Sequence, residues 1–284
     1  MADMKYGNYV KQLAFTPGRG GANAKELVFV SGEDMGGFEF NFIIGVYDQT
    51  GDWAPGAGAH NHPFDELLLF FGYDDNDMSY LGSDMELSLG KEWEPHKFSV
   101  PTVGVAPQGF PHCPLVTEKV YKPFGHFHLA LSATYSGERV AKEGETEGNK
   151  YSHLMKPMKI EQGEGGSGAV QFVRMSGDEL EGLNIHFIMG LLNQPGVMAR
   201  GMHIHPYDEA IVFFGHNTDD LSYLGAEISL EIGNEREKHT FDKPTVIAIP
   251  RGVPHGMLTC NKVDRPYSGM VVGLGPKNES SPVD

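Results

Sequence analysis

The chain is poor in the residue types that mark several classes of protein. Its 284 residues contain two cysteines, Cys113 and Cys260, which are too few for a disulfide framework and fit a reducing compartment. No stretch approaches the roughly 18–20 apolar residues that cross a bilayer, and residues 1–15 lack the apolar core of a signal peptide. We therefore expect a cytoplasmic protein with no membrane partner.

Basic side chains are also scarce. The 22 Lys and Arg residues are outnumbered by 38 Asp and Glu residues, which leaves a formal charge of −16. An acidic chain without a basic cluster repels phosphate, so we expect no nucleic-acid partner. The hydrophobic share of 40% is that of a globular chain, and 37 glycines with 18 prolines suit many strands joined by tight turns.

One pattern of histidines and glutamate is present twice. The first copy comprises His60, His62, Glu66 and the more distant His112. The second copy follows 143 residues later and comprises His203, His205, Glu209 and His255. Many positions between and around the motifs recur at the same spacing, including Asn41 and Asn184. A period this long indicates a duplicated domain and not a solenoid.

The segments between the motifs predict the fold class. Short β-branched and aromatic runs, such as residues 27–30 and 38–44, are separated by turn signals about every 8–12 residues, which is typical of all-β sandwiches and barrels. With the duplication, this predicts two β-barrels. The expected boundaries are an N-terminal arm and first barrel over 1–140, a charged and glycine-rich linker over 141–168, and a second barrel over 169–284.

The spacing of each motif fits a metal site. Its two histidines and glutamate lie an even number of positions apart, so extended chain places all three on one face, although Pro63 and Pro206 indicate a turn between each histidine pair and its glutamate. The distant histidine follows a Pro-x-Gly-x-Pro turn, which fixes its backbone as it enters a neighbouring strand. Neutral imidazole and carboxylate suit Mn²⁺, Fe²⁺, Ni²⁺, Cu²⁺ or Zn²⁺, and the lack of thiolate disfavours structural zinc. We expect up to two divalent metals per chain, each with positions open to substrate.

The alternative is that these histidines are hydrogen-bonded core residues without a metal. That interpretation suits a lone buried histidine, but two matched sets with a glutamate each favour metal binding.

These motifs resemble those of the cupin superfamily, which run Gly…His-x-His-x(3–4)-Glu…Gly and Gly…Pro-x-Gly-x-x-His. Because both halves carry them, the resemblance implies a bicupin with two tandem jelly-roll barrels. Similar bicupins include oxalate decarboxylases, dioxygenases, isomerases and storage globulins. The chain departs from oxalate decarboxylases because no stretch matches their mobile acid-bearing lid. It departs from storage globulins because both halves keep their ligands.

The extension His-x-His-Pro-(Phe/Tyr)-Asp-Glu at 60–66 and 203–209 resembles a group of bacterial and fungal cupins. The chain is also similar to Mn-dependent ring-opening hydrolases of cyclic 1,3-diketones, of the dihydrophloroglucinol cyclohydrolase type. With this resemblance Mn²⁺ is the favoured metal, Fe²⁺ is the next choice, and Zn²⁺, Ni²⁺ and Cu²⁺ follow.

Residues that differ between the halves are candidates for specialised roles. His126 and His128 align with Gly269 and Val271. They lie two apart on a predicted strand and so share a face. That face is either the first barrel's interior, where both are catalytic candidates for proton transfer, or an outer surface.

Two further candidates lie in the second half. His186 stands where the first half has Ile43, and is either a base near the second metal or a core substitution. Arg200 precedes the second histidine pair and is either a substrate-binding residue for a carboxylate or enolate or a surface arginine.

Other residues near the motifs have structural interpretations. Cys113 directly follows a ligand, and adjacent strand residues point to opposite faces, so we expect it to pack away from the site. His96 and His239 recur outside the metal motif and are expected to be structural. Asp65 and Asp208 flank the ligating glutamates and are expected to orient loops.

Several functions remain open at this point. The first is a metal-dependent enzyme acting on a small diketone, enol or phenol, by hydrolytic carbon–carbon cleavage, which the resemblance favours, or by reaction with dioxygen. The second is a binding or storage protein stabilised by its metals. One barrel or both can be catalytic. The only partner expected is a small-molecule substrate, and a homo-oligomer remains open.

Overall fold

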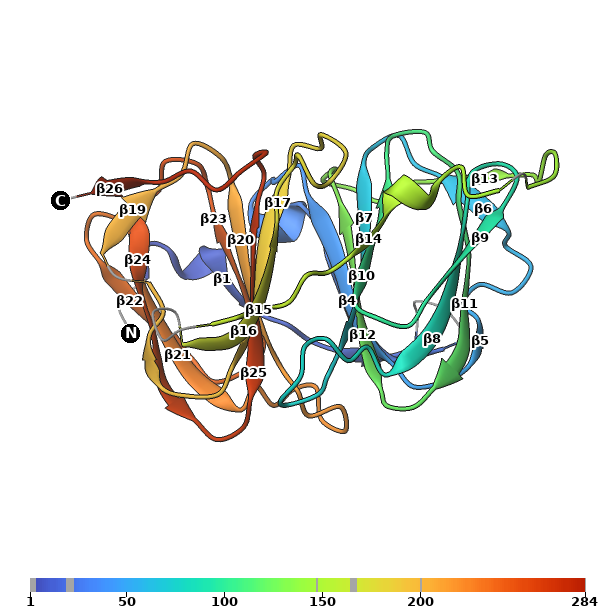
Figure 1. The fold of residues 1–284 in the computed structure, drawn as a ribbon. Helices are drawn as coiled ribbons and strands as arrows, with labels where there is room; N and C mark the ends of the chain where they lie inside the picture. The colour runs from blue at the N-terminus through green and yellow to red at the C-terminus, as the bar shows by residue number, and fades with distance from the viewer. Residues whose placement is uncertain (1–3, 19–22, 147, 164–167, 200, 284) are drawn as a thin grey trace. The chain divides into compact units, whose positions relative to one another are not determined.

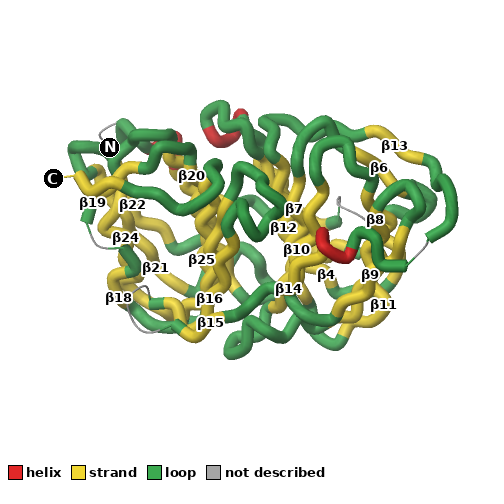
Figure 2. The backbone as a smooth tube through the Cα atoms, turned by 45° about the horizontal axis from the view of Figure 1, so that its top comes forward, coloured by secondary structure: helices red, strands yellow, loops and turns green. Residues whose placement is uncertain are grey.

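The structure is a computed structural model, and it describes residues 4–18, 23–146, 148–163, 168–199 and 201–283. Within these ranges the chain consists of β-strands joined by loops, as Figure 1 and Figure 2 show. The helical segments are short 3-10 turns, η1 (Gly7–Tyr9), η2 (Glu33–Met35) and η3 (Ser152–Leu154). The all-β prediction is therefore confirmed. Among the same residues, no helix has the length and apolarity to cross a membrane.

The chain forms two compact units. We call Phe15–Asp74 with Met78–Met158 the first barrel, and Met1–Ala14, Asp75–Asp77 and Lys159–Asp284 the second barrel. Each contains one seven-stranded and one six-stranded sheet, and every strand pairing is antiparallel.

The two sheets of the first barrel join strands that are far apart in the sequence (Figure 1). The seven-stranded sheet runs in the order β14 (Met155–Pro157), β10 (Thr102–Ala106), β7 (Glu66–Gly72), β12 (Phe124–Ala130), β4 (Asn41–Tyr47), β3 (Ala24–Val30) and β2 (Thr16–Pro17). The six-stranded sheet runs β13 (Glu138–Val140), β6 (Ala59–Asn61), β11 (His112–Val120), β8 (Ser83–Leu89) and β9 (Glu94–Phe98), with β5 (Gly51–Asp52) paired to β11.

The second barrel repeats this order strand for strand. Its seven-stranded sheet runs β1 (Val10–Gln12), β23 (Thr245–Ile249), β20 (Glu209–Gly215), β25 (Tyr267–Gly273), β17 (His186–Leu192), β16 (Ala169–Met175) and β15 (Glu161–Gln162). Its six-stranded sheet runs β26 (Ser281–Val283), β19 (Met202–Ile204), β24 (His255–Val263), β21 (Ala226–Ile232) and β22 (Glu237–Phe241), with β18 (Gly196–Val197) paired to β24.

The continuous apolar run after Glu66 is explained by burial on both faces of β7. Successive side chains of a strand point to opposite sides. Glu66 and Leu68 line a cavity inside the first barrel, while Leu67 and Leu69 on the other side are 0% exposed. A strand buried on both faces needs apolar residues at nearly every position. The glutamate is therefore an exception that requires its own explanation.

The compact units differ from the predicted boundaries at two segments. The N-terminal arm was expected with the first barrel, but β1 pairs with β23 of the second. The segment 141–158 was expected in a linker, but β14 pairs with β10 of the first barrel. The physical reason is that each segment completes the edge of a sheet, and unpaired edge groups favour added strands.

Each of these two segments is held by a glutamate that accepts two backbone N–H groups. Glu237 accepts from Lys5 at 2.8 Å and from Tyr6 at 3.0 Å. Glu94 accepts from Lys150 and Tyr151, both at 3.0 Å. A histidine also approaches each glutamate to 2.9 Å: His239 approaches Glu237, and His96 approaches Glu94. Neither histidine lines the cavity of its barrel, and the structural interpretation of both stays a prediction.

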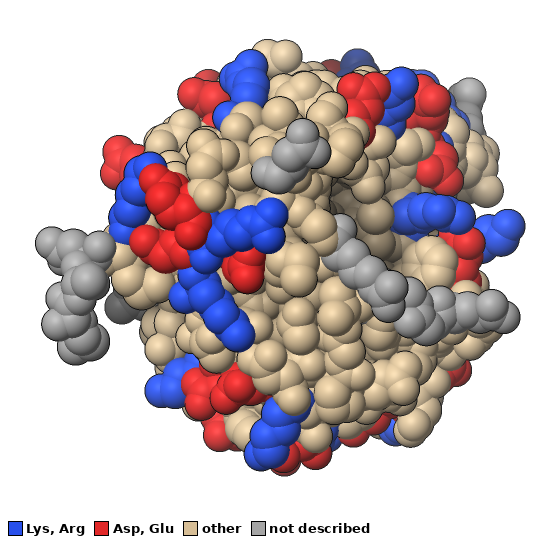
Figure 3. Space-filling view, turned by 90° about the vertical axis from the view of Figure 1, so that its left-hand side faces the viewer, with Lys and Arg blue, Asp and Glu red and all other residues tan. Residues whose placement is uncertain are grey.

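Charged side chains on the face drawn in Figure 3 form mixed groups, with Lys and Arg beside Asp and Glu. Exposed pairs of this kind include Lys262 with Asp264 at 2.7 Å. Such pairs contribute little to stability because water screens them. The fold therefore depends mainly on the apolar side chains between the sheets.

Candidate metal centres

Strand pairing brings the distant histidine of each motif to the histidine pair. His112 is the register partner of His60, and His255 is the partner of His203. In both barrels these two rings have centroids 4.4 Å apart. The backbone ladder between β6 and β11, or β19 and β24, therefore positions ligands that are about fifty residues apart in the chain.

The glutamate completes each set. In the first barrel Glu66 Oε2 lies 2.7 Å from His112 Nε2, and Glu66 Oε1 lies 3.3 Å from His62 Nε2. In the second barrel the matching distances from Glu209 are 3.0 Å to His255 and 3.3 Å to His205. The structure thus brings together all eight predicted ligands in two sets of four, and His203 joins its set within 4.8 Å.

Backbone carbonyls orient the histidine rings. His62 Nδ1 lies 2.6 Å from the carbonyl oxygen of Ser136, and His205 Nδ1 lies 2.6 Å from that of Glu279. His112 makes a similar contact of 3.2 Å with the Phe110 carbonyl. A carbonyl only accepts, so each Nδ1 carries the proton and donates it, which leaves Nε2 as a bare lone pair.

The donor atoms of the first barrel fit a divalent cation. Nε2 of His62, Nε2 of His112 and Oε2 of Glu66 are buried, and none makes a correctly oriented hydrogen bond in the described part of the protein. Buried polar atoms almost always have a partner. Close approach without hydrogen-bond geometry is expected of atoms aimed at a common point. Three imidazole nitrogens and a carboxylate are donors that Mn²⁺, Fe²⁺ and related ions accept.

Electrostatics keep the glutamates and His60 in the ligand form, whereas Glu66 raises the pKa of His112 against the effect of burial. Burial alone would raise the pKa of Glu66, but the neighbouring His128 and His112 imidazoles hold that pKa well below its usual value. Burial lowers the pKa of His60 to about 3. In the second barrel the pKa of Glu209 is also lowered against the effect of burial, by His255 above all. At neutral pH each site therefore offers an ionised carboxylate beside a neutral imidazole.

The first cavity contains polar and aromatic side chains beyond the ligands. It has a volume of about 350 Å³ and is lined by both His126 and His128. His128 Nε2 contacts Glu66 Oε1 directly. Tyr135, which the sequence analysis missed, lines the cavity next to His128, with ring centroids 5.3 Å apart. The interior position of the two histidines, one of the two alternatives, is therefore the one observed.

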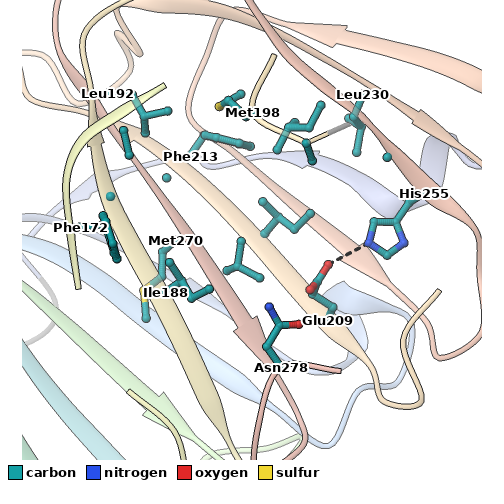
Figure 4. A pocket seen from close by; sticks show the side chains of 18 of the residues that line it. Phe172, Ile188, Leu192, Met198, Glu209, Phe213, Leu230, His255, Met270 and Asn278 are labelled. Atoms are coloured by element: carbon teal, nitrogen blue, oxygen red, sulfur yellow. Dashed lines mark hydrogen bonds and ion pairs between the residues drawn. The ribbon is translucent and has the colours of Figure 1, made fainter. Parts of the chain in front are cut away.

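The second cavity is apolar apart from its candidate ligands and Asn278. It has a volume of about 400 Å³, and Figure 4 shows Leu192 and Met198 at the end remote from Glu209 and His255. Asn278 is the polar side chain beside the glutamate in this view. It follows Tyr135 by 143 residues, so the spacing of the duplication was the signal that could have identified both residues.

The register of the strands corrects the alignment of His186. The pairings with β12 and β25 place His186 opposite Gly273, as Asn41 lies opposite Ala130. His186 therefore takes the place of Asn41, not of Ile43. The reason is a connection of different length, since residues 53–58 join β5 to β6 and only 198–201 join β18 to β19.

The contacts of His186 place it beside the second site without making it part of the cavity wall. Its Nδ1 donates to the Gly275 carbonyl at 2.8 Å, the bond that Asn41 Nδ2 makes to the Ser132 carbonyl at 2.7 Å. His186 is not among the residues that line the second cavity. Arg200, the predicted substrate-binding residue, lies outside the described residues.

The prediction that Cys113 packs away from the site is wrong. Its thiol lies within 4.8 Å of the ligand atoms of His60 and His112, and it lines the first cavity. Strand β11 carries a bulge between His112 and Leu115, and Cys113 has a φ of 72°. A bulge inserts one residue and breaks the alternation of faces on which the prediction relied. Burial raises the pKa of this thiol.

The interpretation of Asp65 and Asp208 is confirmed. Asp65 Oδ1 accepts the backbone N–H of Gln108, and Asp208 Oδ1 accepts that of Arg251, both at 2.8 Å. These bonds tie the turn before each distant histidine to the start of the glutamate strand.

Comparison with known proteins bears on the fold. No protein-family model and no curated protein sequence matches the chain. Solved structures of Bacillus subtilis oxalate decarboxylase do match, covering 96% of this chain and 79% of theirs at 10% identity. A variant with arginine replaced by alanine has a TM-score of 0.63, and one with tryptophan replaced by tyrosine 0.64. A third structure, described for the enzyme's Mn(II) centres, has a TM-score of 0.63 and 10% identity.

At this identity the likeness shows the fold alone. Together with the strand order of both units, it shows that the chain has the bicupin fold of two tandem cupin barrels. The fold expected from the two motifs is confirmed.

Proposed function

We propose that this protein is a divalent-metal-dependent bicupin enzyme that acts on a small oxygenated molecule. The observation that carries the proposal is the convergence of buried donor atoms without hydrogen-bond partners from His62, Glu66 and His112, of which Glu66 and His112 line a cavity. Mn²⁺ is the proposed metal. Nitrogen and carboxylate donors suit it, and the Mn(II) centres of the structurally similar oxalate decarboxylase support the choice. His60, His62, Glu66 and His112 would hold one ion, and His203, His205, Glu209 and His255 the other.

The lining of the cavities favours an uncharged substrate or an enol. None of the described residues that line either cavity is Lys or Arg. Among the described residues a dianion such as oxalate would find no cationic side chain there, whereas a ketone, enol or phenol needs only donors and acceptors. When bound, a divalent metal supplies Lewis acidity that stabilises negative charge on such an oxygen.

We place the reaction in the first barrel and propose hydrolytic ring opening of a cyclic 1,3-diketone. Hydrolysis adds the hydroxyl group of water to a ring carbonyl carbon, breaks the bond to the neighbouring ring carbon and adds a proton to that carbon. His128 is outside the ligand set, contacts Glu66 and lines the cavity. We assign delivery of the proton to its Nε2 atom. The second barrel has Val271 at this position and is proposed to bind metal without this reaction.

The test combines metal analysis with an anaerobic assay. The purified full chain should contain two manganese ions after loading, and Glu66→Gln or Glu209→Gln should each retain one. Without dioxygen, the loaded protein should convert 1,3-cyclohexanedione to 5-oxohexanoate. His128→Ala should keep both metals and lose turnover by about 100-fold or more.

Three outcomes would contradict parts of this proposal. Turnover that requires dioxygen would replace hydrolysis by oxidative cleavage. Full metal content with no turnover of diketones, enols or phenols would favour a metal-stabilised binding protein. Turnover that survives in Glu66→Gln but not in Glu209→Gln would move the reaction to the second barrel.

A further inference from the structure

The inner end of the first cavity holds a histidine with an unused acceptor atom. His126 is 5% exposed, and its Nδ1 lies 3.1 Å from the carbonyl oxygen of Leu69. The carbonyl only accepts, so Nδ1 carries the proton and Nε2 is left as a lone pair. Nε2 has no hydrogen-bond partner among the described residues. Because His126 lines the cavity, this lone pair is available to a ligand that supplies a donor.

Aromatic packing fixes the orientation of this ring. Phe70 is stacked on His126 with centroids 4.7 Å apart, and Trp53 meets it edge-on at 5.1 Å. Trp53 is itself stacked on Tyr47 and donates its Nε1–H to Thr117 Oγ1 at 2.8 Å. The rings around His126 therefore offer flat apolar surface, and the Trp53 donor is already used. His126 Nε2 is an acceptor at this end, beside the Tyr47 hydroxyl and the Asp52 carboxylate, which also line the cavity.

The distance from the metal site fits a single small ring. His126 and His128 are nearly parallel, with centroids 6.3 Å apart, because they are alternate residues of β12. His128 in turn contacts Glu66. The rise of two residues along a strand is roughly 7 Å. A ligand with one oxygen at the metal site and a second group at His126 therefore has about this distance to bridge.

We propose that His126 Nε2 is a specificity-determining hydrogen-bond acceptor, which selects ring substrates bearing a hydroxyl group opposite or meta to the oxygen held at the first metal site. The class of ligand is thus a dihydroxylated ring or its enol tautomer. Burial lowers the pKa of His126 to about 3, in keeping with a neutral ring that accepts. The role differs from proton transfer, for which His126 was a candidate from the sequence.

The second barrel keeps the counterpart of Phe70, Phe213, but lacks the histidines and the other aromatic rings of this arrangement. Strand register puts Gly269 at the position of His126 and Val271 at that of His128. Leu192 takes the place of Tyr47, since both are the last residues of matching strands. Met198 and Leu192 close the same end of the second cavity with aliphatic surface (Figure 4). The second cavity therefore has no acceptor at this end for a ring hydroxyl.

The inference rests on the proposed function for the oxygen at the metal, and it is tested by binding. Both tryptophans, Trp53 and Trp93, lie in the first barrel, so tryptophan fluorescence reports ligands there. The manganese-loaded full chain is titrated with resorcinol and with 3-methoxyphenol, which differ by one hydroxyl donor. Resorcinol should bind about ten-fold tighter, the equivalent of one hydrogen bond.

His126→Phe keeps the stacked ring and removes the acceptor, so the preference for resorcinol should fall below about two-fold. His126→Gln, which keeps an acceptor, should retain part of the preference for resorcinol over 3-methoxyphenol. The control is His96→Phe, which also removes a buried histidine of the first barrel but one outside the cavity, and it should leave the preference unchanged. Because each preference is a ratio within one preparation, partial unfolding does not affect it.

The inference is overturned if the wild type shows no preference or if His126→Phe keeps it. Manganese content, measured on the same samples, separates this failure from that of the proposed function. A chain that holds manganese without the preference fails here alone, whereas a chain that holds no manganese fails the metal proposal.

Discussion

The Nδ1 atom of His62 and the carbonyl oxygen of Ser136 lie 2.6 Å apart, and they link a metal ligand to the segment that enters the edge strand β13. The second barrel repeats this contact between His205 and Glu279, just before β26. Each edge strand also pairs with the strand that carries the first histidine of its site. These late strands therefore orient ligands that precede them by more than seventy residues.

Ending the chain after Lys277 should weaken the second metal site alone. The truncation removes the Glu279 carbonyl, so the His205 ring loses the bond that fixes its tautomer, and such losses weaken metal binding about 10- to 100-fold. Isothermal titration with Mn²⁺ should show one site with unchanged affinity and one weakened site. Equal affinities at both sites would show that the carbonyl does not orient His205.

Tryptophan fluorescence should report metal binding to the first barrel only. Trp53 lines the first cavity, and both tryptophans belong to that barrel. Paramagnetic Mn²⁺ should therefore quench the emission of the wild type and of Glu209→Gln, but not of Glu66→Gln. Zn²⁺, which has no unpaired electrons, serves as the control ion. Quenching that disappears in Glu209→Gln and persists in Glu66→Gln would contradict the assignment.

The metal-free protein should lose stability as the pH falls from about 6.5 to about 3. Burial lowers the pKa of His126 to about 3, so the folded state binds fewer protons than the unfolded state across this range. Protonation therefore favours unfolding, by up to about 1.4 kcal/mol per pH unit for one such group. His126→Phe should flatten the dependence of the unfolding free energy on pH in urea titrations.

The exposed His153 provides the control for this measurement. His153→Gln should leave the slope unchanged. If His126→Phe keeps the wild-type slope, the acid sensitivity comes from other groups, such as His60, whose pKa burial also lowers to about 3.

Glu237→Gln should loosen the N-terminal arm without affecting the equivalent segment of the first barrel. One carboxylate accepts the N–H groups of Lys5 and Tyr6, and an amide offers a single accepting oxygen, so at least one bond is lost. Hydrogen exchange read by mass spectrometry should become about ten-fold faster or more in peptides covering residues 4–13.

The reciprocal variant gives the matched control. Glu94→Gln should speed exchange over residues 149–157 and leave residues 4–13 unchanged, because Glu94 holds Lys150 and Tyr151 in the same way. If either variant loosened both segments equally, the two glutamates would not act as separate anchors.

The ligand sets were predictable because the same residue types recur in the same order. The residue types and spacing identified the ligands, but the shared strand face predicted for His60 and Glu66 is wrong, since His60 lies on β6 and Glu66 begins β7 in the other sheet. A second copy at constant spacing then removed the ambiguity of a single motif. The features missed depend on chain geometry that composition does not encode. The bulge that turns Cys113 toward His60 requires a positive φ at a non-glycine residue. The change in alignment that makes His186 the counterpart of Asn41, and not of Ile43, comes from the length of one loop.

By itself, then, the sequence determined the duplicated all-β fold and the eight candidate ligands, because short strand-like runs between turn signals and a motif repeated at constant spacing indicate them. Only the tertiary structure decided which sheet edges the two arms complete, and that His126, His128 and Tyr135 meet in one cavity while Gly269 and Val271 replace the two histidines in the other. The physical reason is that these contacts arise when sheets close on themselves. Closure brings together strands whose separation along the chain does not reveal their proximity.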